Sequence, residues 1–145
     1  MDLAYIFLAE AAAAGDGKFF AFGGGVHYLH TPGFPTTLSS IAVVVGVHLL
    51  PEEIHPDHRV ELRGISPNGE AFFRESTTPL PAAPIPGRLD LPLLSIVVFN
   101  FRGLQLSSPG TYTFVLSVDS RELGRVSFSC HIAPPAEQNP ANLSE

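Results

Sequence analysis

The segment Leu106–Ile132, LSSPGTYTFVLSVDSRELGRVSFSCHI, contains two runs in which apolar and polar side chains alternate. Alternation with a period of two is typical of β-strands that bury one face. The runs cover residues 111–118 and 124–132, and the polar residues 119–122 separate them. The segment therefore predicts a β-hairpin with a short turn.

Tyr112 follows the turn-forming pair Pro109-Gly110 at the start of this hairpin. In Greek-key β-sandwiches, a tyrosine at such a corner bonds through its hydroxyl group to backbone a few residues upstream. We therefore interpret Tyr112 as a structural residue. The hairpin indicates a sandwich scaffold and carries little information about function.

The rest of the chain also consists of short strand-like runs separated by turn signals, among them Gly15-Asp16-Gly17 and Pro67-Asn68-Gly69. The segment from Ser76 to Pro92 contains five prolines and is expected to be a long loop. Eight strands are expected at residues 3–12, 18–30, 40–49, 58–65, 70–74, 94–101, 111–118 and 124–132. This spacing predicts an all-β fold, an antiparallel immunoglobulin-like β-sandwich of about seven to nine strands with little or no helix. Residues 1–133 should form one domain, and residues 134–145 a flexible polar tail.

Composition restricts the classes of partner. The chain has 145 residues, 14 acidic and 8 basic residues, and a net charge of −6. This balance argues against nucleic acid as a partner, because nucleic-acid binding depends on neutralising phosphates with Lys and Arg. No apolar run reaches the roughly 18 residues of a membrane-spanning helix, so we expect no membrane span.

Cellular location is inferred from cysteine usage and from the N-terminal segment. Cys130 is the only cysteine, which excludes an internal disulfide and favours a cytoplasmic location; we interpret it as a small core residue. The apolar residues 3–14 lack a basic start and include Glu10, so they predict a strand in preference to a secretory signal or a short helix. The abundance of Arg, Ala and Pro suggests a bacterial source.

Two expected strands are apolar on both faces, which is unusual for a sheet with one wet face. Either the proline-rich loop 76–92 covers the outer face, or this face contacts a second copy or another protein. The residues of this candidate interaction surface are Val43, Val45, Val97, Phe99 and Phe101.

The six histidines are candidate metal ligands. His27 and His30 are three apart in an expected strand, so they point to opposite faces and cannot share an ion. His55, Asp57 and His58 lie close together in a loop and could chelate, but no further ligand completes a known zinc spacing. A cupin-like pattern is also absent from the sequence, and we expect no metal and no cofactor.

The run Gly23-Gly24-Gly25 resembles a phosphate-binding loop only in composition, because no Gly-Lys-Ser/Thr follows it. Within a strand, three glycines indicate a bulge, a bend or close packing of backbone. A ligand or partner that approaches bare backbone is the alternative. No serine lies in a nucleophile elbow and no catalytic residues are expected, so the sequence predicts a protein that is not an enzyme.

Several segments together resemble a family of small bacterial proteins of unknown function. They are residues 8–11, the segment GKFFAFGGGV at 17–26, residues 58–62 leading to the turn at 67–69, and residues 109–112 leading to 123–126. The resemblance covers about residues 3–132, and the segment 17–26 is its most specific part. It implies a stand-alone cytoplasmic β-sandwich and implies no activity or functional residues.

These observations lead to a hypothesis of a non-catalytic interaction or assembly module, with a homo-oligomer as one form. The alternative is a small-ligand or metal-binding protein that uses His55, Asp57 and His58 or the backbone of Gly23–Gly25. The glycine-rich segment, the two doubly apolar strands and the proline loop are the places where function is expected.

Overall fold

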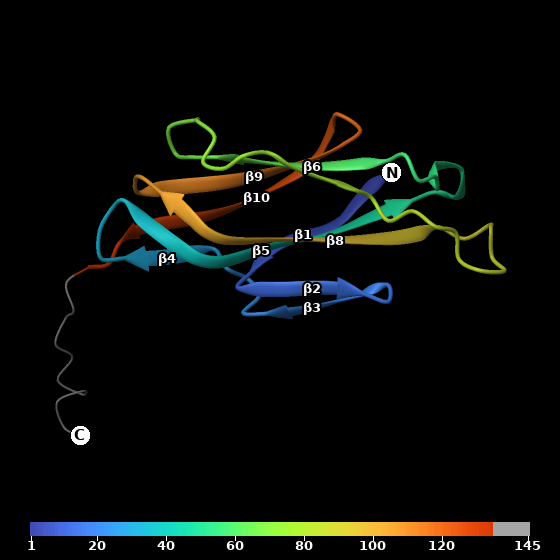
Figure 1. Cartoon of the computed structure of the whole chain (residues 1–145), viewed down its shortest axis with the longest axis horizontal. Helices are drawn as coiled ribbons and strands as arrows, with labels where there is room; N and C mark the ends of the chain where they lie inside the picture. The colour runs from blue at the N-terminus through green and yellow to red at the C-terminus, as the bar shows by residue number, and fades with distance from the viewer. Residues whose placement is uncertain (135–145) are drawn as a thin grey trace, which may run out of the picture.

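The computed structural model describes residues 1–134, and Figure 1 shows their arrangement in layers. The described residues contain ten strands, a single 3-10 turn and no α-helix, which confirms the all-β prediction while exceeding the expected number of strands. The elements are β1 (Asp2–Ala9), β2 (Ala11–Gly15), β3 (Lys18–Phe22), β4 (Tyr28–Thr31), β5 (Thr36–Leu49), η1 (Pro51–Glu53), β6 (Arg59–Ile65), β7 (Ser76–Pro79), β8 (Leu93–Leu106), β9 (Gly110–Val118) and β10 (Arg121–Ile132). Apart from Pro134, the predicted tail lies outside the described residues.

The strands form three sheets. One has the order β1-β5-β8, the second β4-β10-β9-β6-β7, and the third is the hairpin β2-β3. All pairs are antiparallel except β4 with β10, which is parallel and corrects the expectation of a purely antiparallel fold. The three-stranded and five-stranded sheets face each other across one hydrophobic core.

Strand β5 supplies the centre of this core. It pairs with β1 on one side and β8 on the other, and every residue from Ile41 to Val47 is buried. Alternate residues point into the core, where the pairs Val43–Phe99 and Val45–Val97 lie opposite strands β6, β9 and β10. Burial of each such side chain contributes about 1.5–3 kcal/mol to stability.

The structure therefore places the candidate interaction residues inside the molecule. Val43, Val45, Val97 and Phe99 belong to the buried core. The half-buried Phe101 packs against the rings of Phe73 and Phe114, and does not form an open surface. Because both faces of β5 and β8 are apolar, their periodicity did not indicate which face points inward.

Two expected strands are each divided in the structure. The strand expected at 3–12 ends at Ala9 and restarts at Ala11, and the strand expected at 18–30 is interrupted by Gly23–Gly25. At these breaks the chain leaves the three-stranded sheet, forms the hairpin β2-β3, and then enters β4 of the five-stranded sheet. A chain changes from one sheet to another through a bend, a bulge or a break, and here it does so at the two breaks.

The segment expected to be a strand at 70–74 is not one, apart from a single bridge between Ile65 and Ala71. Its two aromatic residues instead pack into the core: the ring of Phe72 meets Tyr112 at 5.1 Å, and the ring of Phe73 meets Phe114 at 5.7 Å. Consecutive side chains that both point inward are incompatible with the alternation of a strand.

The proline-rich segment 76–92 does not cover the outer face of β5. It begins with the short strand β7, paired to β6, and then buries Leu80 at the edge of the core. The hydroxyl group of Ser95 on β8 donates a hydrogen bond to the carbonyl of Pro81. The segment is therefore held beside the start of β8.

Tyr112 occupies the position expected of a tyrosine corner. Its hydroxyl group donates a hydrogen bond to the Ser108 carbonyl at 2.6 Å and accepts one from the Ser108 amide at 3.3 Å. The ring is fully buried and stacks on Phe128 at 5.3 Å. These contacts join the β8–β9 connection to the core.

Replacing Tyr112 with phenylalanine should lower the free energy of unfolding by about 1–3 kcal/mol, because the Ser108 backbone groups lose their partner. Urea denaturation measures this change. Tyr28→Phe is the control, since Tyr28 is about half exposed and should tolerate the change. Equal losses in the two variants would contradict a structural role for the Tyr112 hydroxyl group.

Candidate functional site

The hairpin β2-β3 forms a layer of its own on the outer face of the three-stranded sheet (Figure 1). Its two-residue turn consists of Asp16 and Gly17, both with positive φ, of 51° and 70°. This is the backbone of a type I′ turn, which favours glycine at its second position and suits the twist of a tight hairpin. The Gly-Asp-Gly signal in the sequence is therefore explained.

The inward face of the hairpin is aromatic. Phe19 packs against two β1 side chains, with ring centroids 5.6 Å from Tyr5 and 5.5 Å from Phe7. Gly46 on β5 makes room for Tyr5, since a Cβ atom at Gly46 would lie 2.4 Å from the tyrosine ring. This small aromatic cluster seals the outer face of β5 and buries the tyrosine, which raises the pKa of Tyr5 by desolvation.

Polar contacts fix the hairpin in place. The side chain of Asn100 on β8 accepts a hydrogen bond from the Ala12 amide at 3.3 Å and donates one to the Ala12 carbonyl at 2.8 Å. The hydroxyl group of Ser40 donates to the Glu10 carbonyl at 2.5 Å. The Asn100 side chain thus bonds to the two backbone groups of Ala12 that would otherwise pair with a neighbouring strand.

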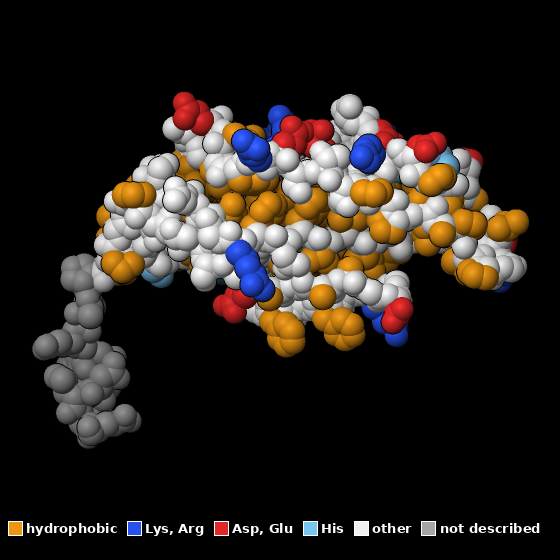
Figure 2. Space-filling view, in the orientation of Figure 1, with side chains coloured by type: hydrophobic (Ala, Val, Ile, Leu, Met, Phe, Trp, Pro, Cys, Tyr) orange, Lys and Arg blue, Asp and Glu red, His pale blue; other side chains and the backbone are white. Residues whose placement is uncertain are grey.

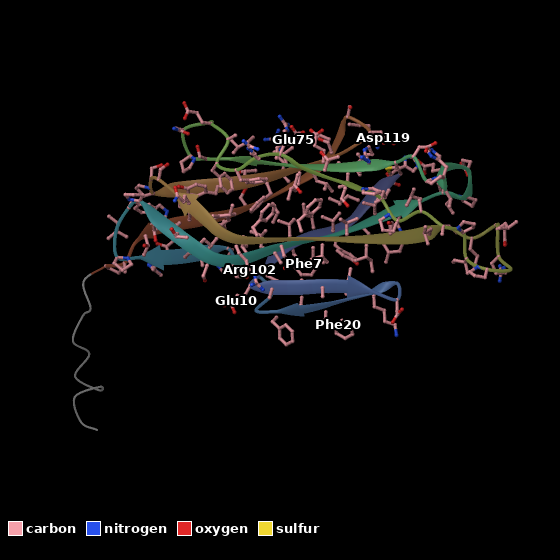
Figure 3. All side chains as sticks on the ribbon, viewed as in Figure 1. Phe7, Glu10, Phe20, Glu75, Arg102 and Asp119 are labelled. Atoms are coloured by element: carbon pink, nitrogen blue, oxygen red, sulfur yellow. The ribbon has the colours of Figure 1, made fainter. Side chains whose placement is uncertain are left out.

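The outward face of the hairpin is apolar and exposed. Phe20 and Phe22 are 66% and 72% exposed, and their cross-strand partners on β2 are Ala13 and Ala11. Figure 2 shows hydrophobic side chains protruding below the molecule, and Figure 3 shows Phe20 pointing away from the sheets. We call Ala11, Ala13, Phe20 and Phe22 the aromatic face.

The sequence contained a signal for this surface, because Phe20 and Phe22 alternate with Phe19 and Ala21. The prediction of a single strand over residues 18–30 does not reveal this exposed face. In a strand of the two main sheets, the phenylalanines on one face of the strand would be expected to point into the core.

The run Gly23–Gly25 is the connection between β3 and β4 and is engaged by its own chain. The Gly25 amide donates to the Leu8 carbonyl at 2.8 Å, and the Glu10 side chain lies against Gly23, where φ is 61°. Any Cβ at Gly23 would come within 2.6 Å of Glu10. These positions favour glycine for backbone geometry and close approach.

The structure brings His55 and His58 together but also engages His58 internally. Their rings lie 3.7 Å apart. The Nδ1 of His58 is 2.5 Å from a carboxylate oxygen of Asp119, and its Nε2 is 2.5 Å from the Glu53 carbonyl. Both partners are acceptors, so the two contacts are hydrogen bonds at the same time only when both ring nitrogens carry protons. A ring bonded in this way has no lone pair for a metal.

Asp119 is the partner that joins His58 to the β9–β10 turn. Its second carboxylate oxygen accepts the Arg59 amide at 3.0 Å, and its φ is 49°. Burial alone would lower the pKa of His58, but the hydrogen bonds to Asp119 and Glu53 outweigh it and the pKa is raised. For Asp119, burial acts in the opposite direction and would raise the pKa of the carboxyl group. The hydrogen bonds from His58 and Arg59 outweigh burial, so the pKa of Asp119 is lowered.

Within residues 1–134, no three His, Cys, Asp or Glu side chains converge on a position suited to a metal ion. Cys130 is buried in the core, and desolvation raises the pKa of its thiol. The part of the chain that is described contains no helix long and apolar enough to cross a bilayer.

Several depressions mark the described surface. One, of about 630 Å³, lies beside β6, and its lining includes Arg63, Phe72 and Phe73. Another, of about 460 Å³, lies between the start of the hairpin and β4, and its lining includes Glu10 and Leu29. The apolar walls of these two continue into the core.

The described part of the protein is thus an all-β chain that carries an exposed aromatic hairpin on its outer face. It belongs to the DUF6941 family, a family of unknown function, whose model matches residues 4–131. The expected membership in an uncharacterised family is therefore confirmed.

No curated protein matches the chain. Solved structures similar to it include the Pseudomonas fluorescens alkylpurine DNA glycosylase AlkC bound to DNA containing an abasic site analog, with a TM-score of 0.44 and 12% identity. The match covers 90% of this chain and 30% of the glycosylase chain. A likeness of this size carries no argument about function.

Replacing Asn100 with alanine should loosen the hairpin, because Ala12 loses both of its side-chain hydrogen bonds. We expect faster amide hydrogen exchange across residues 11–22 and a loss of about 1 kcal/mol in unfolding free energy. Gln105→Ala, at an exposed position of the same strand, is the control. Unchanged exchange in the hairpin would show that Asn100 does not hold it.

The His58–Asp119 pair should make stability depend on pH. A raised folded pKa of His58 stabilises the protein fully below the unfolded value near 6.5, and this contribution is lost as pH rises through the folded pKa. Unfolding measured from about pH 5 to about pH 8 should therefore show declining stability, and His58→Gln should abolish that decline while costing about 1–3 kcal/mol at the acidic end.

His55→Gln serves as the matched control, because His55 is the neighbouring ring without these two bonds. It should retain the decline with pH. If His58→Gln and the original chain had parallel stability profiles, the pairing with Asp119 would not be the source of the pH dependence.

Proposed function

We propose that the chain is a non-catalytic protein-interaction module and that the aromatic face of the β2-β3 hairpin is its contact surface. The observation that carries this proposal is the pair Phe20 and Phe22, exposed side by side on a separate hairpin that Asn100 anchors to the sandwich. Aromatic side chains are enriched at the energetic centres of protein interfaces.

The rigidity of the hairpin supports the proposal. Its inner aromatic residue is locked against Tyr5 and Phe7, so the outward residues project from a fixed platform. Binding to a preorganised surface costs less conformational entropy than ordering a flexible loop. The groups on this face are hydrocarbon, with the ammonium group of Lys18 at one end, and such groups recognise a partner more readily than they catalyse a reaction.

The finer expectations drawn from the sequence belong to the same proposal. The Tyr112 corner supports an immunoglobulin-like sandwich, and the single cysteine supports a cytoplasmic location. A net charge of −6 supports a protein partner in preference to nucleic acid. Composition supports a bacterial source.

The proposal is tested by placing a photoreactive p-benzoylphenylalanine at Phe20 in the cells that make the protein. Irradiation should produce a discrete covalent adduct, and mass spectrometry should identify the protein attached at that position. The aromatic face lies within the contact in this proposal, so the reactive group would be close to the partner.

The same group at Leu89 is the matched control, since Leu89 is 73% exposed in the loop before β8. It should produce no comparable adduct. A chain that reacts equally at both positions, or at neither, would show that the aromatic face is not a contact surface.

A further inference from the structure

We propose that the open edge of β3 pairs with β3 of a second copy of the chain, antiparallel and about a two-fold axis through Phe20. This inference rests on the proposed function, because the strand that it pairs carries Phe20 and Phe22 of the aromatic face. It is carried by the direction of the backbone groups on β3, by the lack of cover over its edge, and by the charges at its two ends.

The direction of the backbone groups follows from Asn100. Its contacts show that the amide and carbonyl of Ala12 point away from β3. Residues directly opposite one another in an antiparallel pair point their backbone groups either toward each other or both away. Ala21 lies opposite Ala12, so its amide and carbonyl point out from the other edge of β3. The same holds for Phe19, two residues earlier.

No described segment lies along the free edge of β3. In contrast, Asn100 caps β2, and Ser95 near the start of β8 is bonded to Pro81. Strand β3 pairs only with β2, and its sequence, KFFAF, contains no proline and a single charge at its end. An uncovered edge of this kind is a template for another strand.

A two-fold axis through Phe20 satisfies these groups. It places Phe19 opposite Ala21 of the second copy, and Ala21 opposite Phe19 of the second copy. Each of these pairs exchanges two backbone hydrogen bonds, so about four bonds form. Between them, the two copies of Phe20 form a non-hydrogen-bonded pair, in which side chains approach most closely. The two aromatic faces then join into one continuous apolar surface.

Charge favours this antiparallel arrangement. Lys18 lies at one end of β3, while Glu10 lies beside Phe22 at the other, where the Glu10 amide donates to the Phe22 carbonyl at 3.0 Å. Neither side chain forms an ion pair within residues 1–134. The two-fold axis brings Lys18 of each copy opposite Phe22 of the other, near Glu10, so that cation–π and ionic contacts form at both ends. A parallel pairing would place like charges together.

The register is tested with purified protein by cysteine cross-linking. Phe20→Cys should form a disulfide-linked dimer under mild oxidation, because residues opposite each other in a non-hydrogen-bonded pair lie within reach of an S–S bond. Phe22→Cys should not, since position 22 faces position 18 in the second copy. Cys130 is buried and does not compete, and Leu89→Cys reports random collisions.

The edge is tested by sedimentation across a range of protein concentrations. The original chain should be a dimer that dissociates on dilution. Ala21→Pro removes an outward amide from each copy and should raise the dissociation constant by about tenfold or more. Ala21→Ser keeps the amide and should leave the dissociation constant nearly unchanged. Circular dichroism verifies that both variants remain folded.

A chain that stays monomeric at all concentrations, or a dimer that cross-links at position 22 and not at position 20, would overturn the inference. In that case, an adduct from position 20 with a different protein in cells would leave the proposed function intact. Without that adduct, both the β3 pairing and the proposed function would be contradicted. Selective cross-linking at position 20 together with the Ala21→Pro effect would support the pairing.

Discussion

Strand β5 is buried on both faces, and this one constraint accounts for the layered arrangement of the protein. Its inward side chains, such as Val43 and Val45, need a second sheet opposite them, and β6, β9 and β10 supply it. Its outward side, which includes Val44 and Gly46, needs a second cover, and Tyr5, Phe7 and the hairpin supply it. An apolar strand left with one wet face would lose the stabilisation that comes from removing that face from water.

The second cover creates the surface on which the proposed function rests. A two-stranded hairpin can bury only one of its faces against the sheet, and in this chain both faces are aromatic. The inner residue, Phe19, completes the outer cluster, while Phe20 and Phe22 are left facing solvent. The same element therefore seals the fold and exposes hydrocarbon, which explains why this all-β fold keeps an apolar surface.

The hydrogen bonds of His58 hold together the end of the molecule that contains η1 and the β9–β10 turn. His58 joins the carbonyl of Glu53 to the carboxylate of Asp119, which lies 61 positions later in the chain. The sequence suggested His58 as a metal ligand or the start of a strand, and His55, Asp57 and His58 do lie in or beside one loop. The partner could not be foreseen, because Asp119 belongs to a turn whose position in space depends on the pairing of β6 with β9.

Local patterns were sufficient for the all-β class, the β9-β10 hairpin, the tight turn at Asp16-Gly17 and the contact of Tyr112 with backbone just upstream. These depend on side-chain alternation and turn chemistry, which act over a few residues. Which face of β5 points inward, where the chain changes layers at Glu10 and Gly23–Gly25, and which phenylalanines of β3 remain exposed were settled only by the tertiary structure. Each of these depends on contacts between distant segments, and a strand that is apolar on both faces contains no local signal to distinguish them.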